Sequence, residues 1–148
     1  MVLSTDTDIG ILLGLAYAGF VDELRADLAA RGFADLGPSY GYVFRVLGDG
    51  ERSLSELAGL LGMTLPGAGK IVDEMEARGY VERHPDASDR RVKQLRLSPR
   101  GRAALKAAQA FHRRFERRLP DGPALRAALE GIATDAGGEP APRYVRPL

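Results

Sequence analysis

Residues 53–79 read SLSELAGLLGMTLPGAGKIVDEMEARG, and this stretch predicts two short helices joined by a tight turn. Ser53 and Glu56 have the spacing of a capping box, in which each residue satisfies a free backbone N–H of the other. Gly62 ends the first helix, because a left-handed residue is needed there. The predicted core side of this helix consists of Leu54, Leu57, Leu60 and Leu61.

The second helix is predicted over residues 64–78. Thr64 is a good N-cap, and Pro66 is tolerated in the first turn because its missing N–H would have no partner there. A core stripe at i, i+3, i+4 and i+7 consists of Ala68, Ile71, Val72 and Met75. The opposite face carries one cation, Lys70, in the N-terminal half of the helix.

Beyond Gly79 the apolar period changes to two, which predicts a hairpin. Residues 80–84 and 91–97 are expected to form its strands, and residues 85–90 have turn chemistry throughout. Residues 52–53 can add a third strand. The fold class is therefore mainly α with a small β wing: a winged helix-turn-helix, whose second helix would enter the major groove of DNA.

Long helices are expected on both sides of this module. One spans residues 7–30 and stops at Gly32, and a short one spans residues 38–47. Ser98 caps a long helix after the wing, with a stripe of Ala104, Leu105, Ala108, Phe111, Phe115 and Leu119. A last helix carries Leu125, Ala128, Leu129 and Ile132.

These elements suggest three parts: an N-terminal dimerisation helix (1–36), the winged module (37–98), and C-terminal dimerisation helices with a tail (99–148). The terminal helices have more apolar surface than a compact winged helix needs to cover, and a soluble monomer rarely exposes such patches. A homodimer is therefore expected. The tail 139–148 contains three prolines and is expected to be extended.

Positive charge is concentrated in one segment although the net charge is only +1. Residues 78–118 hold 13 Lys/Arg against 4 Asp/Glu, whereas residues 1–77 hold 5 against 12. This is the distribution expected for phosphate neutralisation by the wing and the helix after it. For the four arginines at 113, 114, 117 and 118, a plain solvated helix face is the alternative.

Several motifs together resemble the MarR (multiple antibiotic resistance regulator) family of winged helix-turn-helix transcriptional regulators. The resemblance extends from about residue 54 to residue 101. It rests on Leu57-x-x-Leu-Leu-Gly62, Val72-Asp73-x-Met75-Glu76-x-x-Gly79-Tyr80-Val81-x-Arg83, Asp89-Arg90-Arg91 and Leu97-Ser98-x-x-Gly101. It implies a homodimer with intertwined terminal helices, reading a palindromic operator with helix 64–78 in the major groove and wing 81–97 at the minor groove. It also implies a repressor that a small-molecule ligand releases.

The resemblance assigns the sharpest role to Arg91, which would enter the minor groove while paired with Asp89. A simple salt bridge that stiffens the turn is the alternative. The complete predicted DNA-binding set is Ser53, Thr64, Leu65, Pro66, Gly67, Gly69, Lys70, Asp89, Arg90, Arg91 and Lys93. Residues 65–69 depart from the family pattern because they lack polar side chains, so direct base readout is expected to be sparse.

A small aromatic or anionic effector is a further partner that the resemblance implies. The aromatic residues expected to line its cleft are Tyr17, Phe20, Tyr40, Phe44 and Phe111. An aromatic side chain at helical spacing is more often part of the core, and that alternative stays open.

Other classes of function have little support in the sequence. There is no cysteine, and the two histidines, His84 and His112, suit neither a metal site nor a general base, so no metal, cofactor or enzymatic activity is expected. The longest uncharged apolar run, residues 9–21, is too short for a bilayer, so a cytoplasmic protein without a membrane partner is expected. The alternative function is a winged-helix protein-interaction or dimerisation module with weak or non-specific DNA binding.

Overall fold

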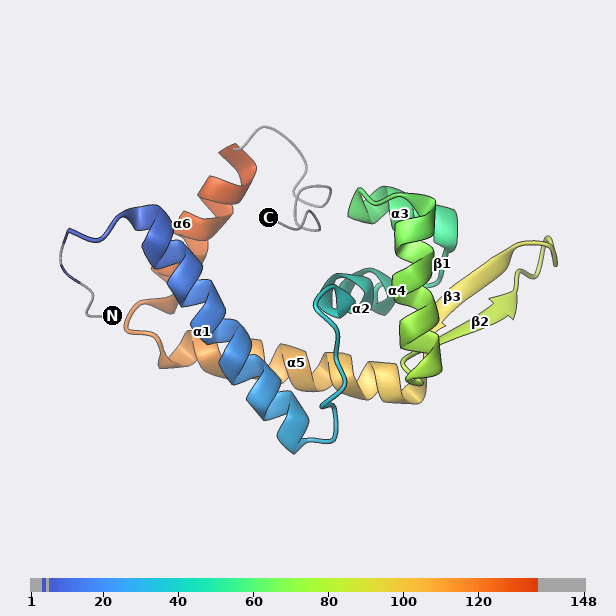
Figure 1. The fold of residues 1–148 in the computed structure, drawn as a ribbon, viewed down its shortest axis with the longest axis horizontal. Helices are drawn as coiled ribbons and strands as arrows, with labels where there is room; N and C mark the ends of the chain where they lie inside the picture. Colours follow the sequence, from blue (N-terminus) through green and yellow to red (C-terminus); the bar gives the residue numbers. More distant parts are fainter. Residues whose placement is uncertain (1–3, 5, 136–148) are drawn as a thin grey trace. The chain divides into compact units, whose positions relative to one another are not determined.

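The computed structural model describes residue 4 and residues 6–135, so the predicted tail 139–148 lies outside the described residues (Figure 1). The described chain is mostly helical with one small antiparallel sheet, as predicted. Its elements are α1 (Ile9–Ala30), α2 (Tyr40–Gly48), β1 (Arg52–Ser53), α3 (Leu54–Leu61), α4 (Leu65–Ala77), β2 (Val81–Pro85), β3 (Lys93–Leu97), α5 (Pro99–Arg118) and α6 (Gly122–Asp135). Contacts divide the chain into two units, residues 1–36 and 37–148.

The first unit consists of α1, which ends where the sequence predicted. Gly32 adopts a φ of +93°, the left-handed backbone that favours glycine. Along this helix many large apolar side chains are exposed; Ile9 is 72% exposed and Tyr17 is 64% exposed. The others are Ile11, Leu13 and Leu15.

The helix-turn-helix of the second unit forms through the predicted caps. The hydroxyl of Ser53 accepts the backbone N–H of Glu56 at 3.1 Å. Gly62 has a φ of +62°, and the Thr64 hydroxyl accepts the N–H of Gly67 at 3.1 Å. These local bonds fix where α3 ends and where α4 begins.

One core prediction for α3 is wrong. Leu60 is 44% exposed, while the small residue Ala58 is buried in its place beside Leu57 and Leu61. The helix has only about two turns, so its buried side is set by the pair at 57 and 61, which are four residues apart. Leu60 points about 100° away from Leu61 and therefore leaves the core.

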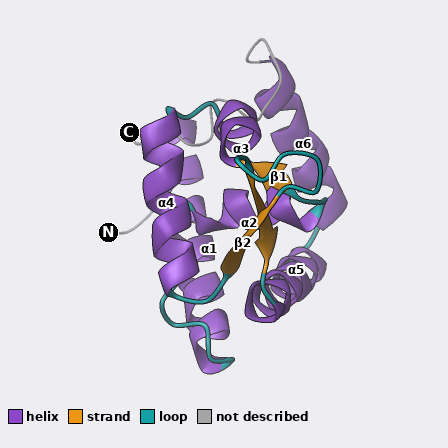
Figure 2. Ribbon diagram, turned by 90° about the vertical axis from the view of Figure 1, so that its right-hand side faces the viewer, coloured by secondary structure: helices purple, strands orange, loops and turns teal. Residues whose placement is uncertain are grey.

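The sheet has the order β1-β3-β2, with all neighbours antiparallel. Figure 2 shows its strands in orange among the helices. Residues 52–53 form the predicted third strand, with Arg52 opposite Leu95. The predicted strand 80–84 is shifted by one residue from β2, which includes Pro85 of the predicted turn, and the predicted strand 91–97 begins two residues before β3. Tyr80 donates its N–H to the Met75 carbonyl at 2.8 Å and so belongs to the exit of α4, and Val92 donates to the Asp89 carbonyl at 3.0 Å as part of the hairpin turn.

The core of the second unit is centred on Tyr80, which is fully buried. Its ring meets the edges of Tyr40 and Phe44 at centroid distances of 6.3 and 5.6 Å. The Tyr40 hydroxyl accepts a bond from Arg78 at 2.8 Å and donates to Glu74 at 3.4 Å. This cluster joins α2 to α4 and thereby sets the position of α4.

The helix α5 follows β3 and begins at a third cap, in which the Ser98 hydroxyl accepts the N–H of Gly101 at 2.9 Å. Phe111 is buried on this helix, and Glu116 binds Arg126 of α6 through a bidentate ion pair, one bond of which measures 2.8 Å. The apolar stripe of α6 is nevertheless exposed. Its exposed members are Leu125, Leu129 and Ile132, with 45%, 45% and 59% of their surface accessible.

Candidate nucleic-acid interface

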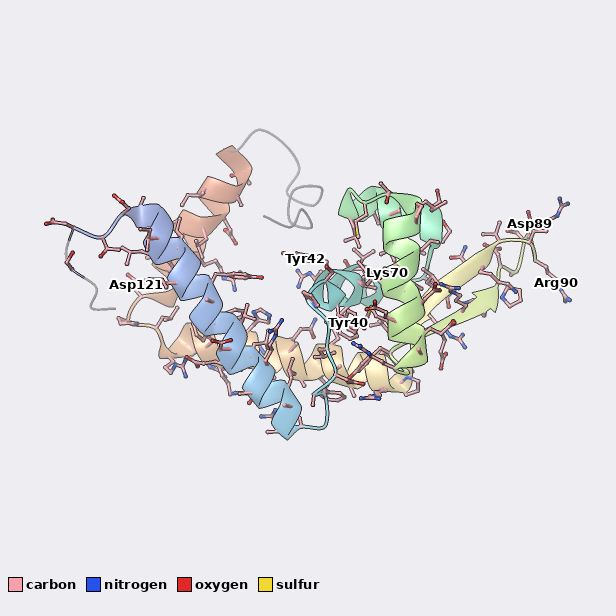
Figure 3. All side chains as sticks on the ribbon, viewed as in Figure 1. Tyr40, Tyr42, Lys70, Asp89, Arg90 and Asp121 are labelled. Carbon is pink, nitrogen blue, oxygen red and sulfur yellow. The ribbon has the colours of Figure 1, made fainter. Side chains whose placement is uncertain are left out.

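The outer face of α4 is open to a partner. Lys70 is exposed on this face, and Leu65 is 52% exposed (Figure 3). An open hollow of about 560 Å³ runs along the helix. Its lining residues are Leu54, Leu65, Pro66, Gly69, Lys70, Asp73 and Glu74.

The carboxylate of Asp73 on this face forms an ion pair with an arginine of the hairpin. Arg83 of β2 donates to Asp73 at 2.6 Å and lies 3.7 Å from Glu76. A carboxylate near DNA would repel phosphate, so this pairing makes α4 more compatible with an anionic partner. Sequence analysis did not assign this role to Arg83, because the contact joins residues ten positions apart on different elements.

The hairpin projects from the helices of its unit and carries Asp89 and Arg90 near its tip (Figures 1 and 3). Its turn is held by Asp86, whose carboxylate accepts the N–H and the hydroxyl of Ser88, both at 2.7 Å, and the Gln94 amide at 2.7 Å. The bonds from Ser88 first, and then that from Gln94, lower the pKa of Asp86 to about 2. Asp86 is a second residue that sequence analysis missed, although an Asp two residues before a Ser is a known Asx-turn signal.

Arg91 and Asp89 lie together as the resemblance implied. The Asp89 carboxylate accepts the backbone N–H of Arg91 at 3.0 Å, and the Arg91 Nε lies 3.8 Å from the same oxygen. The Arg91 side chain is 94% exposed, so the carboxylate fixes the backbone of the turn while the guanidinium remains available to a partner. Arg90 and Lys93 are exposed on the same hairpin.

Apart from Ser53, which caps α3, the predicted DNA-binding residues lie on α4, at its N-cap, or on the hairpin. Two of them, Ser53 and Thr64, use their hydroxyls as helix caps. Their side chains therefore shape the surface, and any contact they make with DNA would have to leave these acceptor bonds in place.

The predicted ligand residues are divided between the two units. Tyr17 is exposed and Phe20 half-buried on α1, in the first unit. Tyr40 and Phe44 pack on Tyr80 in the core of the second unit, and Phe111 packs on Phe115 at a centroid distance of 6.0 Å. For Tyr40 and Phe44 the structure shows a core role.

Comparison with known proteins agrees with this geometry. The sequence model of the MarR family matches residues 34–92, which include the helix-turn-helix and most of the hairpin. This part of the chain is therefore similar to MarR-family winged-helix proteins. The same motifs that carried the resemblance, from α3 to the hairpin, lie in or next to the matched segment.

Proteins similar to this chain include regulators of transcription. It is 27% identical over 128 residues to the exopolysaccharide II synthesis transcriptional activator ExpG of Rhizobium meliloti (strain 1021), covering 86% of this chain and 66% of that protein. The transcriptional repressor CouR bound to a 23-mer DNA duplex is 26% identical with a TM-score of 0.69, covering 92% of this chain and 99% of that one. CouR from Rhodococcus jostii RHA1 bound to p-coumaroyl-CoA is 25% identical with a TM-score of 0.63, covering 93% and 100%.

Two further features concern the described part of the chain. None of the helices in residues 6–135 is both long enough and apolar enough to cross a membrane. Within the same residues, His, Asp and Glu side chains form no group of three that could hold a metal ion.

Proposed function

We propose that this chain is a homodimeric transcriptional regulator of the MarR family that places α4 in the major groove of DNA and the hairpin at the minor groove. The observation that carries the proposal is the hairpin tip, where Asp86 and Asp89 order the turn and leave Arg91 almost fully exposed. An arginine on an ordered support loses little conformational freedom when it binds. Arg91 at the hairpin tip and the exposed face of α4 with Lys70 would then contact one duplex at two separate places.

A narrow A·T-rich minor groove suits such an arginine. The groove concentrates negative potential, and an inserted guanidinium gains from it without a hydrogen-bond code for individual bases. Arg90 and Lys93 lie on the same hairpin and are placed to neutralise phosphates. The binding energy is therefore expected to depend strongly on the wing and on salt concentration.

The dimer is supported by exposed apolar side chains in both units. α1 exposes five large apolar side chains and α6 exposes three, although soluble monomers rarely leave such groups uncovered. A second copy of the chain is the partner we propose for these surfaces. Two-fold symmetry would then place the winged units on half-sites about 34–36 Å apart in a palindromic operator.

We also propose that the protein is a repressor released by a small aromatic or anionic ligand. CouR supports this, because it is described both as a repressor on DNA and in complex with p-coumaroyl-CoA. A ligand can release DNA only if it prefers a conformation that binds DNA poorly. Transcription in vitro from the upstream promoter tests the sign of regulation, and stimulation by the protein, as in an activator such as ExpG, would overturn repression.

Fluorescence anisotropy with two duplexes tests DNA binding. One is the duplex upstream of the protein's own gene, and the other is a shuffled duplex of the same composition, each titrated at several salt concentrations. We expect tighter binding to the upstream duplex and a steep loss of affinity with salt. Absence of binding to either duplex at low salt would refute the proposal and favour a protein-interaction module.

Arg91→Ala provides the residue-level test. It should weaken binding more than tenfold at moderate salt, which corresponds to a loss within the 1–3 kcal/mol typical of a specific arginine contact. Arg25→Ala on α1 is the matched control, since it removes the same charge from an exposed position outside the winged unit. Equal affinities of the two variants would contradict the assignment of Arg91.

Sedimentation equilibrium tests the dimer independently of DNA. The wild type should sediment as a dimer, and Ile132→Glu should shift it toward the monomer because a charge would be placed in the apolar face of α6. A wild type that remains monomeric at high concentration would refute the dimer.

A further inference from the structure

The outer face of α4 combines an apolar hollow with a single cation. Leu54, Leu65, Pro66 and Gly69 form the apolar part of the hollow, and Lys70 lies at its side. Leu65 is more than half exposed, so its side chain is available to a partner at this hollow. The hollow lies on the face that we propose for the major groove.

Few hydrogen-bonding groups remain on the N-terminal half of this face. Leu65, Pro66 and Gly69 have side chains without donors or acceptors, and Pro66 also lacks a backbone N–H. The Thr64 hydroxyl already accepts the N–H of Gly67. The Thr64 O–H and the Lys70 ammonium are the side-chain donors left here, and the rest of this half of the face offers base edges only shape and apolar contact.

The absence of a side chain at Gly69 is not required by the fold. A Cβ added there would meet only the Leu54 Cδ2, at an ordinary contact distance of 3.7 Å. A glycine inside a helix also lowers stability relative to alanine. Gly69 thus keeps the hollow open at a cost to the helix, and the space is available to a group from outside the chain.

The major groove offers one apolar group of suitable size. Of the four bases only thymine presents a methyl group there, whereas cytosine, guanine and adenine present donors and acceptors. The charges around the hollow are compatible with DNA as the occupant: Lys70 lines it, Arg83 pairs with Asp73, and the other lining carboxylate, Glu74, accepts the Tyr40 hydroxyl.

We infer that this hollow binds the C5-methyl group of thymine, with Leu65 as the specificity-determining residue and Lys70 on the adjacent phosphate or guanine. This inference rests on the proposed function, and it names what α4 recognises within the operator. The operator should consequently contain a thymine in each half-site whose methyl group matters for affinity.

Replacing thymine by deoxyuridine tests the inference, because the two bases differ only by the methyl group. In the duplex that the upstream titration identifies, each thymine is replaced in turn and the affinity is measured by fluorescence anisotropy. At one or two symmetric positions uracil should weaken binding about fourfold, the equivalent of about 0.8 kcal/mol for one buried methyl-sized group.

Two variants test whether the loss of affinity caused by uracil arises at the hollow. Leu65→Ala should remove the difference between thymine and uracil, while Leu60→Ala, a similarly exposed leucine on α3, should retain it. Circular dichroism before each titration confirms that both variants are folded.

The possible outcomes separate this inference from the proposed function. If the thymine duplex binds tightly and uracil has no effect at any position, the inference is wrong and DNA binding stands. If uracil weakens binding equally in wild type and in Leu65→Ala, the methyl group is recognised elsewhere and the inference is also wrong. If the thymine duplex does not bind at all, both the inference and the proposed function fail.

Discussion

Gly101→Ala tests how α5 is joined to the winged module. Gly101 lies in the first turn of α5, where the chain leaves β3. A Cβ added there would overlap the carbonyl oxygen of Tyr80, and it would lie 3.1 Å from the Tyr80 carbonyl carbon and 3.3 Å from the Leu97 Cβ. Because the overlap is with backbone, a side-chain rotation cannot relieve it.

The neighbours of Gly101 have little freedom to move. The Tyr80 ring is fully buried, and its carbonyl accepts the Ser98 N–H at 3.0 Å. The Ser98 hydroxyl donates to the Gly79 carbonyl at 2.5 Å, so a shift of α5 would stretch both bonds.

The expected loss of stability follows from three contributions. Overpacking costs about 1–3 kcal/mol, and a weakened buried hydrogen bond costs about 1 kcal/mol. Replacing glycine by alanine in a helix stabilises the folded state by about 0.5–1 kcal/mol, which offsets part of this loss. The net change in the free energy of unfolding is therefore a loss of about 1–3 kcal/mol, and each kcal/mol should lower Tm by about 2–4 °C in a chain of this size.

Urea unfolding followed by circular dichroism measures this change. Gly69→Ala is the matched control, because its Cβ meets only the Leu54 side chain at 3.7 Å. We expect this variant to be more stable than wild type by about 0.5–1 kcal/mol. If Gly101→Ala is as stable as wild type, the protein can accommodate a Cβ beside the Tyr80 carbonyl, and this prediction is wrong.

Three further predictions concern single contacts. Arg83→Ala should weaken DNA binding by exposing the charge of Asp73 on α4, and adding Asp73→Asn should restore it; anisotropy that shows no rescue would contradict this. Because folding lowers the pKa of Asp86, its stabilisation of the wing turn should be complete above about pH 4 and disappear as the pH falls toward 2, which the amide NMR signal of Ser88 reports. Tyr40→Phe should cost about 0.5–1.5 kcal/mol in urea unfolding through the lost bond from Arg78, and an unchanged midpoint would show that this bond adds nothing.

The sequence by itself determined the local signals of this protein. The caps at Ser53, Thr64 and Ser98 and the left-handed Gly62 were all predictable, because each bond joins residues at most four positions apart. The Asp89–Arg91 pair on the wing was assigned through the family resemblance, and its short spacing makes it local as well.

Only the tertiary structure decided which side chains meet across elements. It placed Tyr80 in the core, where the sequence pattern had predicted a strand residue, and it brought Arg83 to Asp73. Sequence periodicity also marked the residue at 60 as core, whereas Ala58 takes that place. Periodicity reports which face of a helix is apolar, but burial depends on the partner elements that cover that face, and their positions are fixed by packing between residues far apart in the chain.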